Sequence, residues 1–355
     1  ALVFLVISCP CALVVSIPLG YFGGIGAASR RGILFKGSNY LDAITHIDAV
    51  VFDKTGTLTC GVFRVQEVHP SGGLTADELL AWAAAAESGS NHPIARAVGE
   101  YAKQQAITLP AVRNTEERAG LGLRAMTDRG ALLVGKAALL AQNQVAYPED
   151  ILHIPDTIVV VALDGRYAGY LLLADEPKPD ASRAVAALHG LGIRNLCILS
   201  GDKSALVGKL AGQLGISRYF GDLMPEDKVR HIEEFQTEEH ARVAFVGDGL
   251  NDAPVLAVSK VGIAMGGLGS DVAIEAADII LQTDQPSKIA EAIRIGRRTR
   301  AVVWQNIIGA LGVKLLVLVL GAFGAATLWE AVFADVGVAL LAILNAVRLL
   351  SDKKD

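Results

Sequence analysis

Hydrophobic residues are concentrated towards the two ends of the 355-residue chain, and a more polar stretch separates them. No charged residue occurs from Ala1 to Ser29, and two further apolar runs extend over about 301–328 and 331–350. Since roughly 20 apolar residues are needed to cross a bilayer, this pattern predicts three transmembrane helices. Arginines and lysines flank each run on one side only, which by the positive-inside rule places the polar body in the cytoplasm.

The polar body contains apolar runs typical of buried strands at 46–52, 195–199 and 241–246, and each is followed by a polar segment. Helical patterns at 204–214 and 253–258 follow the second and third of these runs. We therefore expect a parallel, doubly wound α/β sheet of the Rossmann type. In such sheets, ligands bind at the carboxyl ends of the strands.

Between residues 61 and 173 the pattern changes to helical stretches followed by shorter strand-like runs, which indicates an inserted α+β domain. Because the chain begins inside an apolar run, we expect it to be the C-terminal part of a longer polypeptide. The predicted first transmembrane helix, with its cytoplasmic extension, covers residues 1–28, and two further transmembrane helices cover 301–328 and 331–350. The predicted α/β domain has two parts, 29–60 and 174–296, and the inserted domain between them covers 61–173.

Net charge and cysteine content exclude two classes of protein. The formal net charge is -5, so no basic surface argues for nucleic-acid binding. Four cysteines are too few and too scattered for a disulfide framework. The polar segments that follow the predicted strands therefore indicate a different kind of site.

The first strand run ends directly in the segment DKTGTLT, which begins at Asp53. A carboxylate in this place could attack a phosphoryl group and form an acyl phosphate. Asp248 at a neighbouring strand end could share a Mg²⁺ ion with it. Ser200 could donate a hydrogen bond to the phosphoryl oxygens and Lys228 could neutralise them. Asn251 could position the phosphoryl group or a water molecule.

The residue two positions after this nucleophile decides how long the intermediate lives. An aspartate there would act as general acid and base and would hydrolyse the acyl phosphate quickly. The chain has Thr55 instead, which favours a long-lived phosphoenzyme and an energy transducer over a simple phosphatase.

The segments DKTGTLT, SGD at 200–202 and GDGLND at 247–252 together resemble the signature motifs of the P-type ATPases, with Ser200 in place of the usual threonine. The resemblance implies a haloacid-dehalogenase-like phosphorylation domain that uses ATP and Mg²⁺. The residues that it implies for catalysis are Asp53, Lys54, Thr55, Thr57, Ser200, Gly201, Asp202, Lys228, Asn251 and Asp252, with Asp53, Thr55 and Asp248 around the Mg²⁺ ion.

Two further segments resemble the heavy-metal branch of that family, namely Cys-Pro-Cys at 9–11 and Ser-Asn-His-Pro at 90–93. In that branch the inserted domain binds the nucleotide, and the matching residues here are Glu87, His92, Gly120 and Gly122. Lys314 and the segment Asp-Val-Gly at 335–337 resemble the group that exports zinc, cadmium and lead.

The Cys-Pro-Cys segment has a physical reason for its proline. In a regular helix Cys9 and Cys11 would point about 200° apart, but Pro10 removes a backbone hydrogen bond and prevents regular winding. Both thiols could then bind one ion, with Asp335 as a third ligand. Lys314 lies at the same depth as Asp335, roughly 20 Å from the cytoplasmic side, and could act as its counter-ion.

The function implied is ATP-driven export of Zn²⁺, Cd²⁺ or Pb²⁺ across a bacterial plasma membrane through an aspartyl phosphate. The expected partners are the divalent metal ion, the lipid bilayer, and an upstream actuator domain with early membrane helices of the same polypeptide. Three alternatives stay open, namely a Cu(I)-exporting ATPase, a membrane-anchored phosphatase of the haloacid-dehalogenase type, and a non-enzymatic metal sensor.

Overall fold

The computed structural model describes residues 11–90, 92–118, 120–248, 250–266, 271–325 and 327–350. Cys9 lies outside these residues, and so does the side chain of Cys11. The chain divides into two compact units, which are treated separately below. The first unit consists of Ala1–Leu58, Pro179–Gly201 and Ala211–Asp355, and the second of Thr59–Lys178 and Asp202–Leu210.

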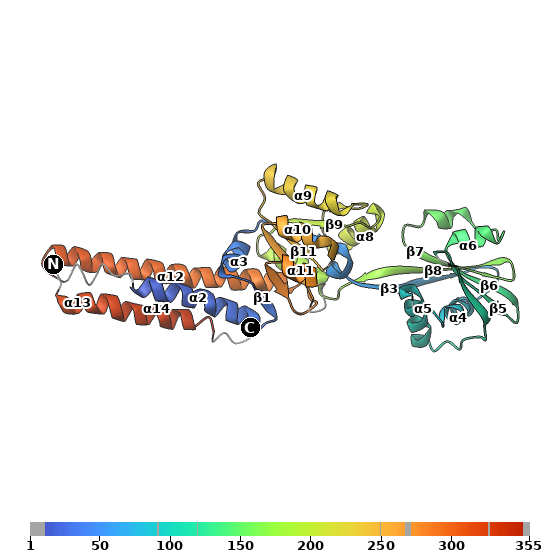
Figure 1. Ribbon diagram of the computed structural model, residues 1–355, viewed down its shortest axis with the longest axis horizontal. Coiled ribbons are helices and arrows are strands. Elements are labelled where there is room, and N and C mark those ends of the chain that lie inside the picture. Colours follow the sequence, from blue (N-terminus) through green and yellow to red (C-terminus); the bar gives the residue numbers. More distant parts are fainter. Residues whose placement is uncertain are drawn as a thin grey trace. The chain divides into compact units, whose positions relative to one another are not determined.

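The first unit is built around a seven-stranded sheet, counted over the described residues, that is parallel except for one edge strand (Figure 1). Its central strands are fully buried, as expected for a sheet covered by helices on both faces. The spatial order is β1 (Ile33–Phe35), β13 (Ile279–Leu281), β12 (Val261–Met265), β11 (Val243–Gly247), β2 (Ala49–Asp53), β9 (Asn195–Leu199) and β10 (Arg218–Phe220).

Helices connect these strands in the right order for a doubly wound fold. They are α3 (Ser38–Ala43), α7 (Ala181–Gly190), α9 (Pro225–Thr237), α10 (Ala253–Val258) and α11 (Asp271–Ala276), with short helical turns η1 (Ile44–His46) and η4 (Leu250–Asp252). α8 (Ser204–Leu214) follows β9 in the chain, and its residues up to Leu210 belong to the second unit. The α/β fold class predicted from the sequence is confirmed. The strand predicted over 46–52 begins later, at Ala49, because Ile44 to His46 form a helical turn. The short strands β1, β10, β12 and β13 were not predicted.

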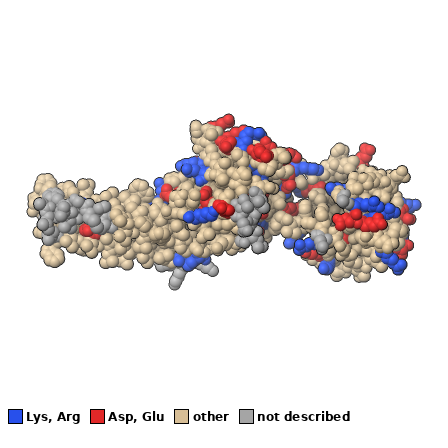
Figure 2. Space-filling model, in the orientation of Figure 1, with Lys and Arg blue, Asp and Glu red and all other residues tan. Residues whose placement is uncertain are grey.

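Three helices of the first unit are long and apolar enough to cross a membrane, over the described windows Ala12–Ser29, Lys288–Ala322 and Trp329–Val347. They correspond to α2 (Cys11–Ser29), to α12 (Lys288–Ala322), and to the segment formed by α13 (Leu328–Val332), the π-helical turn η5 (Phe333–Gly337) and α14 (Val338–Val347). On the face shown in Figure 2, the apolar stretches of these helices carry few charged side chains. α12 is uninterrupted from the polar region into the apolar one, so a single helix connects the sheet to the membrane helices.

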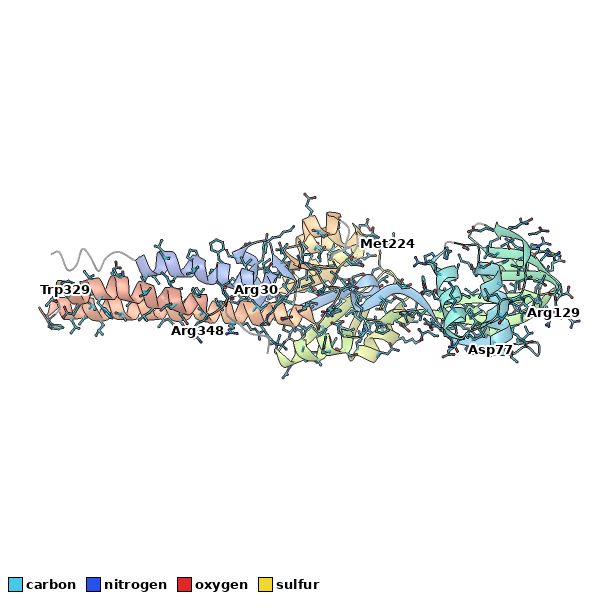
Figure 3. All side chains as sticks on the ribbon, turned by 90° about the horizontal axis from the view of Figure 1, so that it is seen from below. Arg30, Asp77, Arg129, Met224, Trp329 and Arg348 are labelled. Carbon is cyan, nitrogen blue, oxygen red and sulfur yellow. The ribbon has the colours of Figure 1, made fainter. Side chains whose placement is uncertain are left out.

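Small residues allow these helices to pack closely. A Cβ atom on Gly24 of α2 would lie 2.3 Å from Oγ1 of Thr299 on α12, and one on Gly23 would lie 3.3 Å from the carbonyl oxygen of Ala346 on α14. At this end of the bundle, Nη2 of Arg30 donates to the carbonyl oxygen of Leu350 at 2.6 Å. Figure 3 shows Arg30 and Arg348 towards this end and Trp329 at the other. The predicted orientation, with all basic ends together, agrees with this arrangement.

The second unit is a six-stranded antiparallel sheet with helices packed against it, again counted over the described residues. Leu79, Val98, Leu132 and Leu171 are fully buried in its core. The strand order is β3 (Thr59–Pro70), β8 (Arg166–Pro177), β7 (Thr157–Leu163), β6 (Gly130–Gly135), β5 (Gly122–Thr127) and β4 (Arg113–Arg118), and the helices are α4 (Ala76–Glu87), α5 (Pro93–Gln104), α6 (Ala137–Gln142) and the turn η3 (Glu149–His153).

Candidate functional site

Asp53 is the last residue of β2, at the carboxyl edge of the parallel sheet in the first unit. Its side chain is buried, and its Oδ1 accepts a hydrogen bond from Nζ of Lys228 at 2.6 Å. The same Nζ donates to Oδ1 of Asp252 at 2.9 Å. Lys228 lies in the first turns of α9, which begins at Pro225 with the fixed backbone angle that suits a helix start. The structure thus brings Lys228, which was predicted to neutralise phosphoryl oxygens, into contact with Asp53.

Three carboxylates converge at this edge of the sheet. One oxygen from each of Asp53, Asp248 and Asp252 lies within 4.8 Å of the others. Burial and the nearby charge of Asp252 raise the pKa of Asp53 to about 7, although Lys228 acts in the opposite direction. Carboxylate oxygens are the ligands that Mg²⁺ prefers, and a divalent cation would relieve the electrostatic repulsion among the three carboxylates. The cluster therefore fits the predicted Mg²⁺ site, and it adds Asp252 to the expected set.

The loop after β2 is shaped by a glycine. Gly56 has a φ of 73°, and a Cβ atom there would lie 1.8 Å from Oδ2 of Asp248. Only glycine combines this left-handed backbone with so close a neighbour. In the same loop Lys54 is buried and Thr55 is exposed. The hydroxyl of Thr57 is buried, and no partner for it exists among the described residues. A phosphoryl oxygen bound here would give this hydroxyl an acceptor.

The remaining motif residues are placed as follows. Ser200 follows β9 directly and is buried, and its backbone N–H donates to the carbonyl oxygen of Phe220 at 3.0 Å. Gly201 lies close to Leu223, since a Cβ atom there would be 3.2 Å from its carbonyl oxygen. Asn251 is exposed in η4. Asp202 falls in the second unit, so it is not placed relative to Asp53.

All four residues predicted to bind a nucleotide line one pocket of about 340 Å³ in the second unit, namely Glu87, His92, Gly120 and Gly122. Burial, together with the charge of Glu117, raises the pKa of Glu87 to about 7. Nδ1 of His92 accepts a hydrogen bond from the backbone N–H of Ile94 at 3.2 Å and so caps α5. The pocket also contains residues that the sequence did not indicate, among them Glu117, Lys136 and Val159.

In the membrane helices, Nζ of Lys314 lies 3.2 Å from Oδ1 of Asp335. Both side chains are largely buried between α12 and η5, and the predicted juxtaposition of the two charges is present. Ala12 packs with Ala310 and Val338, which lie about one helical turn from Lys314 and Asp335. The backbone that follows the Cys-Pro-Cys segment thus lies beside the charged pair. Neither thiol of that segment is described, so their arrangement around an ion stays a prediction.

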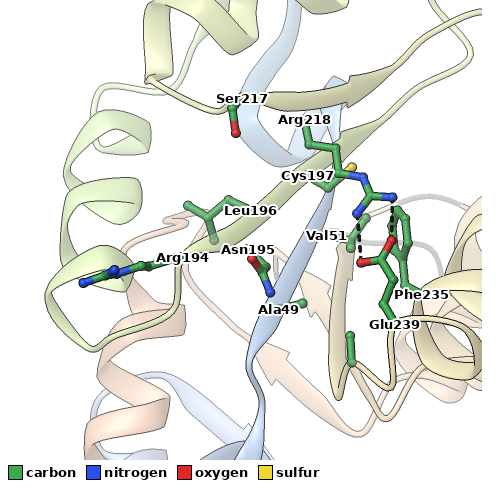
Figure 4. Close-up of a pocket in the computed structure, with 11 residues that line it drawn as sticks. Ala49, Val51, Arg194, Asn195, Leu196, Cys197, Ser217, Arg218, Phe235 and Glu239 are labelled. Carbon is green, nitrogen blue, oxygen red and sulfur yellow. Dashed lines mark hydrogen bonds and ion pairs between the residues drawn. The ribbon is translucent and has the colours of Figure 1, made fainter.

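A further small pocket lies at the opposite, amino edge of the parallel sheet (Figure 4). Arg218 donates two hydrogen bonds to Glu239 there, of 2.8 and 3.0 Å, and its guanidinium stacks 4.1 Å from the ring of Phe235. Burial raises the pKa of the neighbouring Cys197 thiol to about 12. A buried thiol that stays protonated in this way acts as a packing residue.

Comparison with known proteins agrees with the geometry. Residues 47–259 match the family model described as haloacid dehalogenase-like hydrolase. The chain is 54% identical to the cadmium, zinc and cobalt-transporting ATPase of Bacillus subtilis, over 99% of this chain and 50% of that protein. It is 39% identical to the zinc/cadmium/lead-transporting P-type ATPase of Escherichia coli, over 98% of this chain and 47% of that protein. It thus spans about half the length of these curated relatives.

Two solved structures are also similar. A zinc-transporting PIB-type ATPase in the E2.Pi state superposes with a TM-score of 0.89 at 38% identity, over 97% of this chain and 56% of that one. The catalytic domain of the CPx-ATPase CopB-B superposes with a TM-score of 0.60 at 33% identity, over 75% of this chain and 97% of that one. The chain therefore belongs to the haloacid dehalogenase-like hydrolases and, among them, to the heavy-metal branch of the P-type ATPases.

Proposed function

We propose that this chain forms the catalytic and C-terminal membrane part of an ATP-driven exporter of divalent soft metal ions in a bacterial plasma membrane. Zinc, cadmium and lead are the proposed cargo. The names of the relatives support this choice, as does the combination of an intramembrane carboxylate with a Cys-Pro-Cys segment. The exporter would also need an actuator domain and further membrane helices, which we place in the same polypeptide.

The chemistry proposed for the first unit is transfer of the γ-phosphoryl group of ATP to Asp53. An ionised oxygen of Asp53 attacks the γ-phosphorus, the bond to the β,γ-bridging oxygen breaks, and ADP leaves. Asp53, Asp248 and Asp252 would hold a Mg²⁺ ion, which when bound offsets the negative charge of the phosphates. The ammonium group of Lys228 stabilises the same charge, and the buried hydroxyl of Thr57 donates to a phosphoryl oxygen.

The observation that carries this proposal is the position of Asp53, which lies at a strand end against Lys228 and two further carboxylates. The full-length protein should form a metal-dependent phosphoenzyme from ATP that hydroxylamine cleaves, as expected of an acyl phosphate. Asp53→Asn should abolish it, whereas Asp222→Asn, which changes an acidic residue that lies outside the carboxylate cluster, should not. A protein that hydrolyses phosphate esters without such an intermediate would instead be the membrane-anchored phosphatase.

We propose that Lys314 serves as a built-in counter-ion for Asp335 in the transport site. The 3.2 Å contact supports this role, because two opposite charges within a membrane helix bundle stabilise each other strongly. While the metal ion is bound, Asp335 would be one of its ligands. Once the ion leaves, Lys314 would form an ion pair with that carboxylate. Cys9 and Cys11 would supply the remaining protein ligands.

The counter-ion role can be tested by Lys314→Ala in the full-length protein. Phosphorylation by ATP should remain largely intact, while release of the metal ion should be altered. Lys314→Arg keeps the positive charge and should behave more like the unchanged protein. Normal transport by Lys314→Ala would overturn the role.

The choice of cargo can be tested by ATPase stimulation. Zn²⁺, Cd²⁺ and Pb²⁺ should each stimulate the full-length protein, and Cu⁺ should not, because a carboxylate suits divalent ions better than Cu⁺. Stimulation by Cu⁺ alone would favour the copper-exporting alternative. Retention of a metal-dependent cellular response by Asp53→Asn would favour a non-enzymatic sensor.

A further inference from the structure

A basic pocket lies where α12 leaves the polar region and enters the predicted membrane. Thr45 from η1 and four residues of α12 line it, namely Arg297, Arg300, Ala301 and Trp304, and its volume is about 410 Å³. The helical spacing of the four residues places them on one face of α12. None of these residues belongs to the phosphorylation site, the nucleotide pocket or the Lys314–Asp335 pair.

The contacts around α12 fix the level of this pocket relative to the membrane. Thr299, within the stretch that lines the pocket, packs against Gly24 of α2, a little more than one turn before that helix ends at Ser29. Arg30 follows, and it donates to the carbonyl oxygen of Leu350 beyond the end of α14. Basic residues of all three helices therefore lie at one level, as in a cytoplasmic membrane interface.

The two arginines of the pocket present donors suited to a phosphate group. A guanidinium carries five N–H donors and binds phosphate oxygens in pairs. Nη1 of Arg297 donates to the carbonyl oxygen of Leu191 at 2.9 Å, and the side chain is otherwise exposed. Arg300 faces Thr45 and His46 of η1 at 3.5 and 3.4 Å. Its Nε also lies 3.7 Å from Oδ1 of Asp42, an acidic group that offsets part of the charge.

The surface beyond the pocket indicates that the phosphate belongs to a lipid. Trp304 is 50% exposed, and tryptophan favours the level of lipid head groups. The same face of α12 continues with three exposed apolar side chains, Ile308, Leu311 and Leu315. An acyl chain attached to the bound head group could lie along this stripe, whereas a free phosphate ion would gain nothing from it.

We propose that this pocket binds the head group of an anionic phospholipid from the cytoplasmic leaflet, with the phosphate held by Arg297 and Arg300 beside Trp304 and an acyl chain lying along α12. The site is separate from ATP hydrolysis and from the metal pathway. It rests on the proposed crossing of the membrane by α12, and its test must separate failure of that crossing from failure of the site.

Quenching of tryptophan fluorescence by brominated lipids provides the test. The full-length protein is reconstituted into phosphatidylcholine vesicles that contain phosphatidylglycerol, with bromine on the acyl chains of one lipid or of the other at equal mole fraction. The signal of Trp304 is the difference between the protein and its Trp304→Phe variant. Brominated phosphatidylglycerol should quench Trp304 more strongly than brominated phosphatidylcholine does.

The variants identify the residues responsible. Arg297→Gln, with or without Arg300→Gln, should lower the preference for phosphatidylglycerol, by about fivefold for each arginine near an anionic surface. Arg294→Gln is the matched control, because Arg294 is an exposed arginine of the same helix that does not line the pocket. It should keep most of the preference. If the double variant does not fold, the single variant Arg297→Gln still decides the test.

Two results would overturn the proposal. They are equal quenching of Trp304 by the two lipids, and an unchanged preference for phosphatidylglycerol in Arg297→Gln and in the double variant. If brominated lipids quench neither Trp304 nor Trp329, the helices do not lie in the bilayer and the proposed membrane function fails as well.

Discussion

The ammonium group of Lys228 lies 2.6 Å from Oδ1 of Asp53, between this carboxylate and that of Asp252. Burial by itself would lower the pKa of Lys228, but the two carboxylates raise it above its ordinary value. Lys228 therefore stays positively charged in a buried place where a phosphoryl group would bring more negative charge. The same contact holds α9 against the carboxyl end of β2.

Replacing Lys228 by glutamine should show how much this charge contributes. Without the ammonium group the pKa of Asp53 should rise further above about 7, so less of the nucleophile is ionised at neutral pH. We expect phosphoenzyme formation from ATP at pH 7 to fall by about 10²–10³-fold, as for loss of one transition-state donor. Lys260→Gln, at an exposed lysine, is the control. Equal rates of phosphoenzyme formation in Lys228→Gln and Lys260→Gln would contradict a role for the charge of Lys228.

Gly56→Ala should disable the phosphorylation loop. The new Cβ atom would lie 1.8 Å from Oδ2 of Asp248, and the left-handed backbone costs alanine about 1–2 kcal/mol. Asp248 must move, which separates the three carboxylates. We expect phosphoenzyme formation to fall at least about tenfold and to need more Mg²⁺.

Gly73→Ala is the matched control for this prediction. Gly73 also has a positive φ, of 84°, but nothing lies within 4 Å of a Cβ atom built there. It should therefore lower stability slightly and leave phosphoenzyme formation unchanged. Equal activity of Gly56→Ala and Gly73→Ala would show that the contact with Asp248 is unimportant.

Nucleotide binding should weaken as the pH rises through 7. Burial and Glu117 raise the pKa of Glu87 to about 7, so this side chain is neutral below that pH and negative above it. A triphosphate in the same pocket favours the protonated form, and by linkage its own affinity must then fall as that proton is lost. We expect the dissociation constant of ATP to rise up to about tenfold between pH 6 and pH 8.

Two variants test the cause of this pH dependence by calorimetric titration with ATP. Glu87→Gln should remove most of it. Glu117→Gln should shift its midpoint to lower pH, because it removes the charge that adds to the effect of burial. A dependence that is unchanged in both variants would exclude Glu87 as the titrating group.

Asn306 should contribute to the association of α12 with α14. Its Nδ2 donates to the carbonyl oxygen of Ala342 at 3.0 Å, and its Oδ1 accepts from Asn345 at 2.9 Å. Asn306→Leu should lower the stability of the protein in detergent by about 0.5–2 kcal/mol, measured by thermal denaturation. Gln305→Leu removes a longer hydrogen bond, of 3.3 Å from Nδ2 of the same Asn345 to an exposed side chain, and should change it less. The reverse order of the two effects would contradict this assignment.

Cys197 should resist alkylation in the folded protein. Because burial raises its pKa to about 12, only about one thiol in 10⁴ is ionised at pH 8. Iodoacetamide should therefore modify it at least about tenfold more slowly than in the denatured protein, as mass spectrometry of the corresponding peptide can show. Rapid modification of Cys197 in the folded protein would mean that the amino edge of the sheet opens.

Much of the fold follows from short stretches of the sequence. The three apolar runs, the buried strands β2, β9 and β11, and the helices α8 and α10 each have a local pattern that is strong enough to predict them. The signal for the proposed nucleophile is also local, because Asp53 directly follows a buried strand and begins a contiguous motif. The strands β1, β10 and β13 were missed because runs of three residues have no periodicity to detect, and the five-residue β12 is an apolar run that periodicity alone cannot tell from a buried helix segment.

The sequence by itself thus determined the candidate residues for the chemistry and the kind of element on which each of them lies. Only the tertiary structure decided their contacts. Lys228 meets Asp53 across 175 positions of the chain, and the parallel sheet brings Asp248 and Asp252 to the same edge. The tertiary structure likewise places Thr45 and the arginines of α12 in one pocket. Local periodicity depends on neighbours along the chain, whereas such contacts depend on how whole elements pack, which no short stretch contains.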